Sequence, residues 1–238
     1  MKLESSSFRN DQRIPGAYAF AVAHATDHVK LSSNRNPQLN WSGAPAGVKS
    51  FALICHDRDV PSKGDDVNKE GRSVPAGLAR VDFYHWVLVD IPPSLSAIAE
   101  AEFSDGISAR GKKGPEAKHG TRQGLNDYTA WFAGDKDMSG NYFGYDGPCP
   151  PWNDEILHHY VFTVYALDVP RLALSGDFAC RDAILRRRLP RSGRANQAGR
   201  REPGRARRSE VAAAYGFLSL GAHRSAGLGG RDRRDPRG

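Results

Sequence analysis

The stretch YVFTVYALD, from Tyr160 to Asp168, decides the fold class of this sequence. It is short, rich in β-branched and aromatic residues, and largely apolar at both its odd and its even positions. Because successive side chains of a strand point to opposite faces, such a run predicts a strand covered on both faces. Two further runs have the same character: SFALICHD, from Ser50 to Asp57, and FYHWVLVDI, from Phe83 to Ile91. Pro, Gly or Asp bounds all three, as is typical of strands.

Long irregular segments rich in turn-forming residues separate these runs, at 34–45, 61–77 and 104–151. Patterns typical of helices are few. We therefore predict a mainly β fold, a compact antiparallel β-sandwich with long loops and few short helices.

Net charge does not indicate nucleic-acid binding by the body of the chain. The 238 residues carry a formal charge of +7. Residues 1–182 hold 19 Lys and Arg against 23 Asp and Glu, or −4, whereas 183–238 hold 15 Arg against 4 acids, or +11. Since the basic charge lies wholly in the last segment, the body has no electrostatic footprint for a nucleic acid.

The sequence also predicts a cytoplasmic protein without membrane insertion. No apolar stretch approaches the roughly 20 residues needed to cross a bilayer, and the N-terminus MKLESSSFRN has no apolar segment of the secretory type. The three cysteines Cys55, Cys149 and Cys180 have neither the number of a disulfide framework nor the spacing of a metal site.

Common catalytic motifs are missing. The stretch GISARGKK at 106–113 has the first half of a phosphate-binding loop, but Lys113 stands where such a loop needs Ser or Thr, and Pro115 forbids the helix that should follow. There is no nucleophile elbow, zinc-protease motif or dinucleotide fingerprint.

Polar residues suited to holding an anion instead stand at or near strand ends. They occur in HDRDVP at 56–61, in the pair His85-Trp86, and in YDGPCPP at 145–151, which is followed by His158. Taken alone, the first is consistent with an ordinary turn and His85 with a histidine of the core.

Seven separated motifs in this order carry a resemblance to a known family. They are NPQLNW (36–41), PAGVKSFAL (45–53), DRDVP (57–61), HW (85–86) with IP (91–92), NDY (126–128), GPCPP (147–151) and HHYVFTVYALD (158–168). Together they resemble the phosphatidylethanolamine-binding protein family, in its bacterial Raf-kinase-inhibitor-like branch, over about residues 8–182.

The resemblance implies a non-enzymatic binding protein with a small anion pocket for a phosphate-bearing ligand or a phosphorylated partner. It also implies a candidate modulator of kinases or other enzymes, with no cofactor and no metal. In such a pocket an imidazole and a loop amide donate N–H to phosphate oxygens, and a carboxylate orients the imidazole. The matching ligand-binding residues are Asp57, His85, Gly147, Pro148, His158 and Tyr160, supported from behind by Asp59, Pro61 and Trp86.

Two alternative functions stay open, and two departures from the family pattern affect the ion pairing of Asp59. Asp57, His85 and His158 could form a hydrolytic or metal-dependent site, or the Arg-rich tail could bind nucleic acid. Arg58 replaces the usual proline and His159 the usual arginine, so the pairing of Asp59 is open.

The segment 183–238 differs from the rest in composition. It has 15 Arg, 9 Gly and 9 Ala but no Lys, whereas residues 1–182 have 9 Lys and 10 Arg. GC-rich codons read out of frame give such a composition. We therefore predict two parts, a binding domain at 1–182 and an Arg/Gly/Ala-rich tail at 183–238. The tail would be the product of a shifted frame, disordered, and would leave a sheet edge unpaired.

Overall fold

The computed structural model describes residues 1–180, 182–183 and 207–215. The strands are β1 (Lys2–Glu4), β2 (Ala21–His24), β3 (His28–Leu31), β4 (Leu39–Ser42), β5 (Ser50–Pro61), β6 (Arg80–Ile91), β7 (Ala97–Ile98), β8 (Arg122–Gln123), β9 (His158–Leu167) and β10 (Arg207–Tyr215). The short helices are η1 (Gly16–Tyr18), η2 (Lys118–Gly120) and α1 (Tyr128–Trp131).

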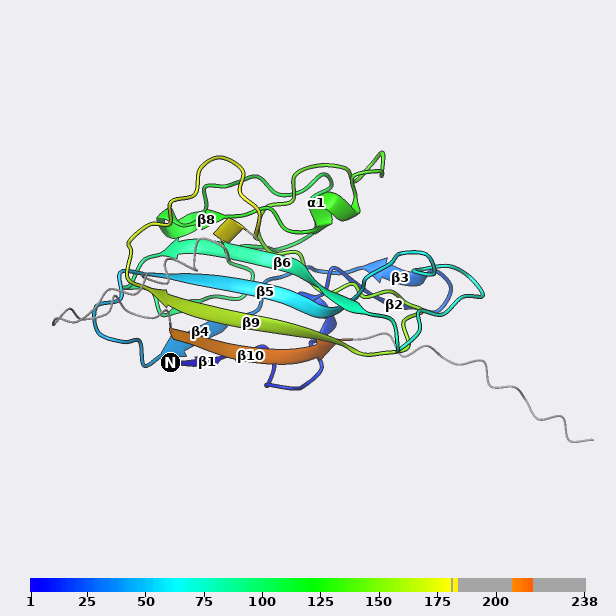
Figure 1. Ribbon diagram of the computed structural model, residues 1–238, viewed down its shortest axis with the longest axis horizontal. Helices are drawn as coiled ribbons and strands as arrows, with labels where there is room; N and C mark the ends of the chain where they lie inside the picture. Colours follow the sequence, from blue (N-terminus) through cyan, green and yellow to red (C-terminus); the bar gives the residue numbers. More distant parts are fainter. Residues whose placement is uncertain (181, 184–206, 216–238) are drawn as a thin grey trace, which may run out of the picture.

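A five-stranded sheet in the order β10-β9-β5-β6-β8 forms the centre of the molecule. A three-stranded sheet, β1-β4-β7, covers one face. The loops that carry β8 and α1 lie above β6 in Figure 1, on the side away from β1 and β4. The hairpin β2-β3 projects at one end. Every pairing between these ten described strands is antiparallel. The predicted mainly β, antiparallel fold with few short helices is confirmed.

The three apolar runs of the sequence are the three longest strands, β5, β6 and β9, and they lie side by side. As predicted, both faces of these strands are covered. One face joins a core with Leu39 and Trp41 of β4, and the other packs against Leu172 and Phe178. Truncating a buried ring such as Phe162 in this core would cost about 3–5 kcal/mol of stability.

Strand β10 corrects one prediction. It lies in the tail, where we expected disorder and an open sheet edge, yet it pairs with β9 from Arg207 opposite Ala166 to Tyr215 opposite His158. The prediction of an unpaired sheet edge was therefore wrong. The open N–H and C=O groups of β9 favour any extended partner, and the run VAAAY within β10 contains no Gly or Pro to oppose pairing. Residues 184–206 and 216–238 of the tail lie outside the described residues, so the predicted frameshift stays a prediction.

Helices in the described ranges are all too short to cross a bilayer.

Candidate functional site

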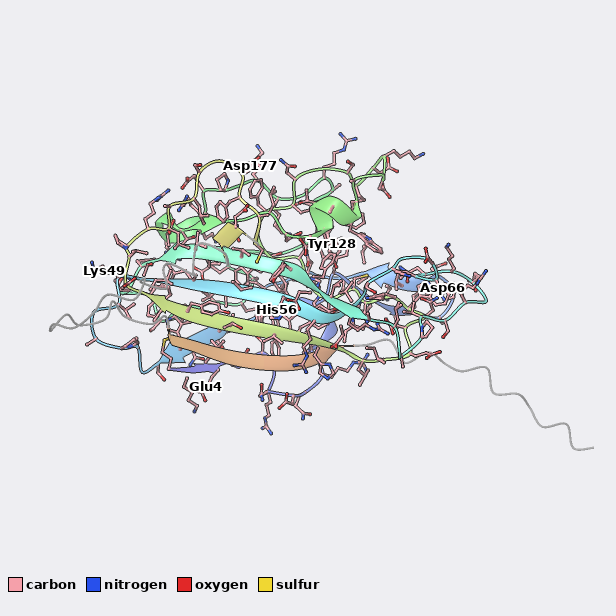
Figure 2. The ribbon with its side chains drawn as sticks, in the orientation of Figure 1. Glu4, Lys49, His56, Asp66, Tyr128 and Asp177 are labelled. Atoms are coloured by element: carbon pink, nitrogen blue, oxygen red, sulfur yellow. The ribbon has the colours of Figure 1, made fainter. Side chains whose placement is uncertain are left out.

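A cavity of about 380 Å³ lies where the ends of β5, β6 and β9 meet the hairpin β2-β3 and helix α1. Tyr128 lines this cavity and is labelled in Figure 2, where it lies above β6. Asp66, also labelled, marks the loop 62–79 on the side of the hairpin. The polar side chains of the lining include Asp57, His85, His158 and Tyr160, and most of the others are apolar.

Strand register brings these polar residues together. Asp57 lies opposite Tyr160 of β9 on one side and opposite Phe83 of β6 on the other. The register of β5 and β6 shifts between Cys55, which pairs with Trp86, and His56, which pairs with Tyr84, so His85 is the extra residue of a β-bulge. Such bulges re-aim side chains. His85 and Trp86, although adjacent, therefore both pack on the same side of the sheet, His85 against Tyr160 with ring centroids 5.1 Å apart.

A buried chain of alternating charges forms one end of the floor. Nδ1 of His158 lies 2.7 Å from Oδ2 of Asp57, and its Nε2 lies 3.1 Å from Oδ2 of Asp154. Asp154 is paired in turn with Arg80, whose Nη1 donates at 2.5 Å. Burial lowers the pKa of His158, but Asp154 and Asp57 outweigh it and raise that pKa to about 9. His158 is therefore a cation at neutral pH, held between two carboxylates.

The Asp57 carboxylate is also occupied. Its Oδ1 accepts the backbone N–H of Asp59 at 2.8 Å. Burial, together with the charge and hydrogen bond of Asp57, raises the pKa of Tyr160 well above its usual value, so its phenol stays protonated. Asp57 thus organises this end of the cavity.

His85 has a different environment. Its side chain is 3% exposed, and its Nδ1 donates to the carbonyl oxygen of Asp146 at 2.7 Å. Burial lowers the pKa of His85 to about 4, so the ring is neutral at physiological pH. Since Nδ1 carries the proton, Nε2 has the lone pair. The ring nitrogen that contacts the Asp146 carbonyl is Nδ1, and the ring lines the cavity.

The loop that orients His85 is itself fixed by buried polar contacts. Oδ1 of Asp146 accepts from Nζ of Lys112 at 2.6 Å and from Asn34 at 2.8 Å, and its Oδ2 accepts from Asn126 at 2.9 Å. The next residue, Gly147, donates its backbone N–H to Oδ1 of Asn34 at 2.8 Å. A Cβ at Gly147 would lie 2.1 Å from the carbonyl oxygen of Tyr18, so only glycine fits.

Comparison with known proteins identifies the family. A family model described as phosphatidylethanolamine-binding protein matches residues 4–188. The chain belongs to this family. The match extends past Asp182, the boundary expected from composition.

Named relatives agree with this assignment. The chain is 32% identical to a UPF0098 protein of Methanothermobacter thermautotrophicus over 168 residues, which are 71% of this chain and 77% of the relative. It is 28% identical to UPF0098 protein YbhB of Escherichia coli over 173 residues, 72% of this chain and 81% of the relative. The predicted family, in its bacterial branch, is confirmed.

Solved structures show the same fold. YbcL of Escherichia coli, described as a member of the mammalian PEBP family, aligns with a TM-score of 0.57 at 21% identity, covering 91% of this chain and 98% of its own. CT736 of Chlamydia trachomatis, a PEBP homolog, aligns with a TM-score of 0.55 at 22% identity, covering 90% and 95%.

Of the residues transferred from the family pattern, five line the cavity and four do not. Those that line it are Asp57, Pro61, His85, His158 and Tyr160. Gly147, Pro148, Asp59 and Trp86 lie outside the lining. Ligand binding by the whole set stays a prediction.

The structure corrects the roles expected for several of these residues. The Gly147 amide, expected to donate to an anion, is taken by Asn34. The carbonyl of Pro148 accepts from the backbone of Phe20. His158, expected to donate to the ligand, has both ring nitrogens bonded to carboxylates. These hydrogen bonds are internal because the loop packs on buried polar groups, so they hold the loop and the strand β9 in place.

Asp59 and Trp86 support the site at a distance. Asp59 accepts from the backbone N–H and Nδ1 of His159, so this histidine replaces the arginine expected as its partner. Trp86 donates from Nε1 to Gln123 at 2.9 Å and packs against Tyr145.

Sequence reasoning missed Arg80, Asp154, Asp146 and Asn34. Arg80 and Asp154 are 74 residues apart in the chain, and Asp146 and Asn34 are 112 apart, so no local pattern joins them. One signal was present: Asp154 precedes His158 by four residues.

The metal-site alternative does not fit these residues. A ligating histidine needs a free ring nitrogen, and both nitrogens of His158 are bonded to carboxylates. In residues 1–180 and 182–183, no three or more His, Cys, Asp or Glu are grouped as a metal site would require.

Proposed function

We propose that this chain binds a phosphate-bearing small molecule or phosphorylated partner with the phosphate next to His85, and that it acts as a cytoplasmic modulator of another enzyme, such as a kinase, without transforming the ligand. The observation that carries the proposal is the Nε2 atom of His85. It belongs to a buried ring that lines the cavity and is held in one tautomer by Asp146. A polar atom so placed is a preorganised binding group.

The protonation state of His85 defines what it recognises. Neutral His85 accepts a hydrogen bond through Nε2, so it matches the P–OH group of a phosphate monoanion. A phosphate dianion brings no such proton, and its binding requires proton uptake by the ring. The proton shared between ligand and His85 is therefore the central feature of the proposed complex.

Charge balance on the floor supports an anionic ligand. Asp57 and Asp154 would repel a phosphate if they stood alone. The cations His158 and Arg80 lie within hydrogen-bond distance of them and neutralise the pair. An anion entering the cavity therefore meets no net negative charge from this group.

The same geometry favours binding over hydrolysis. A general base must accept a proton near neutral pH. Burial sets the pKa of His85 at about 4, which makes it a weak base, and His158 is already protonated with a pKa of about 9. A panel of carboxylic and phosphoric esters tests this directly, and turnover that is lost in His85→Phe would overturn the non-enzymatic assignment.

Calorimetry with inorganic phosphate and phosphoethanolamine tests the binding site. His85→Phe keeps a ring against Tyr160 but removes both nitrogens. Since a hydrogen bond to a charged group contributes about 1.5–3 kcal/mol, we expect affinity to fall at least about tenfold. His24→Phe changes a histidine outside the cavity lining and serves as the control. Equal affinity in His85→Phe and the wild type would overturn the proposal.

A further inference from the structure

Hairpin β2-β3 is loosely built into the molecule. Among the described strands, β2 and β3 pair with each other and with no other strand. Beyond Ala21, their residues are half-buried or exposed. A two-stranded hairpin is marginally stable by itself, and segments with few buried contacts open locally at a lower free-energy cost than the rest of a protein. The position of the hairpin therefore depends on its contacts with the body.

The base of the hairpin is fixed beside Cys149. The backbone N–H groups of Phe20 and Ala21 donate to the carbonyl oxygen of Pro148 at 3.0 and 3.4 Å. Val29 of the hairpin and Cys149 pack against the same apolar cluster, which includes Phe20 and Ala21. Movement of the hairpin away from the body would therefore uncover Cys149.

The tip of the hairpin is held by a second contact, which joins three separate segments. The ring of His28 lies parallel to that of Trp152, with centroids 3.8 Å apart and an interplanar angle of 6°. Nε2 of His28 also lies 2.5 Å from Oε1 of Glu70 in the loop 62–79. In Figure 1 this loop and the hairpin project at the same end of the molecule. We call His28, Trp152 and Glu70 the clip; none of the three lines the cavity.

The side of the clip that receives His28 is fixed. The backbone N–H of Trp152 donates to Oδ1 of Asn68 at 3.0 Å. The next side chain, Asn153, accepts the backbone N–H of Asn68 at 2.9 Å and donates to the carbonyl oxygens of Asp66 and Arg72 at 2.8 and 3.1 Å. The loop 62–79 and Trp152 therefore form one unit, and the hairpin is the part that can move.

The contacts of the clip are strong enough to hold the hairpin and weak enough to release it. Glu70 is exposed, and an exposed ion pair contributes little to stability. The stacked rings of His28 and Trp152 contribute more, because aromatic pairs add to the area that they bury. Opening the clip breaks these contacts without disturbing β5, β6 or β9.

We propose that hairpin β2-β3 is a lid on the cavity, that the clip holds it shut, and that opening of the clip admits small molecules. The proposal concerns access to the cavity and not the identity of the ligand. It therefore stands or falls independently of phosphate binding at His85.

Labelling of Cys149 by a small maleimide in the full chain tests the lid. His28→Asn removes the ring and keeps a residue type that tolerates the φ of 60° found at this position. We expect labelling about fivefold faster than in the wild type, the factor that corresponds to about 1 kcal/mol of lost closing free energy. Glu70→Ala should accelerate labelling less, by about twofold.

His24→Asn is the matched control. His24 lies opposite His28 in the hairpin, and its side chain contacts Asp27 within the same hairpin. We expect this variant to change the labelling rate by less than about twofold. Amide hydrogen exchange should also accelerate over residues 21–31 in His28→Asn and stay unchanged in β5 and β9.

Three results would overturn the lid. The first is an unchanged labelling rate in His28→Asn. The second is equal acceleration in His24→Asn, which would show that the stability of the hairpin itself, and not the clip, controls access. The third is acceleration that extends to the buried Cys55 and Cys180, which would indicate general loosening of the fold.

Discussion

Nδ1 of His158 lies 2.7 Å from Oδ2 of Asp57, although the two residues are 101 positions apart in the chain. This contact joins the end of β5 to the start of β9 beneath the cavity. It converts a buried carboxylate and a buried imidazole into a neutral pair, which Asp154 and Arg80 extend by a second pair. Under the proposed function, phosphate recognition therefore falls to His85, while His158 contributes to stability.

The first prediction is that the protein loses stability as the pH rises toward the pKa of His158. Its folded pKa, about 9, lies above the unfolded value of 6.5. The stabilisation is therefore complete below about pH 6.5 and is lost as the pH rises through about 9. The shift corresponds to up to about 3 kcal/mol. Urea unfolding at a series of pH values measures it.

His158→Gln is the control for this prediction. It should be less stable than the wild type at neutral pH, because Asp57 and Asp154 lose their cation. Its stability should also fall less between neutral and alkaline pH. Parallel curves for the two proteins would show that another group titrates.

The second prediction concerns Gly147. An alanine there would place Cβ 2.1 Å from the carbonyl oxygen of Tyr18, which is backbone and cannot rotate away. We expect Gly147→Ala to destabilise the fold by more than about 3 kcal/mol, in the range of severe core changes. Gly77→Ala, where a Cβ meets nothing within 4 Å, should change stability by less than about 1 kcal/mol. Thermal unfolding of both variants compares them, and a tolerated Gly147→Ala would contradict the close approach.

The fold could be predicted from the sequence because three apolar runs carry most of it. In β9 the residues Tyr160, Phe162 and Val164 enter one core, and Tyr165 and Leu167 the other, as two-sided hydrophobicity implies. Strand β10 was not predicted. Its residues carry a composition typical of disorder, and its strand pairing depends on the open edge of β9.

The sequence could predict which residues stand at the site, but only where a residue type has a single common role in such a position. Asp57, His85 and Tyr160 line the cavity because the strands β5, β6 and β9 carry them there, and their role in ligand binding stays a prediction. The direction of their hydrogen bonds was not predictable. Whether a histidine faces a ligand or two carboxylates depends on residues such as Asp154 and Asp146, whose loops have no regular period.

The third prediction concerns the cysteines. Cys55 is 0% exposed and Cys180 is 1% exposed, whereas Cys149 is half-buried in the cavity lining. A maleimide should therefore modify Cys149 first. The reaction should be slow at neutral pH, because burial raises the pKa of Cys149 to about 12 and keeps the thiol protonated. Cys149→Ser should abolish the early labelling, and early modification of Cys55 would contradict the strand assignment.

The fourth prediction is that affinity for a phosphate monoester rises as the pH falls from about 8 to 6, the range in which the second phosphate proton, with a pKa near 6, is taken up. His158 stays protonated over most of this range with its pKa of about 9, and free His85, with its pKa of about 4, stays neutral. The proton must therefore arrive with the ligand or be taken up on binding, and affinity should change by up to about tenfold per pH unit. Calorimetry in buffers of different ionisation enthalpy measures this uptake. A sulfate monoester, which carries no such proton, should bind weakly with a flat profile, and an equal rise for sulfate would place the titrating group elsewhere in the protein.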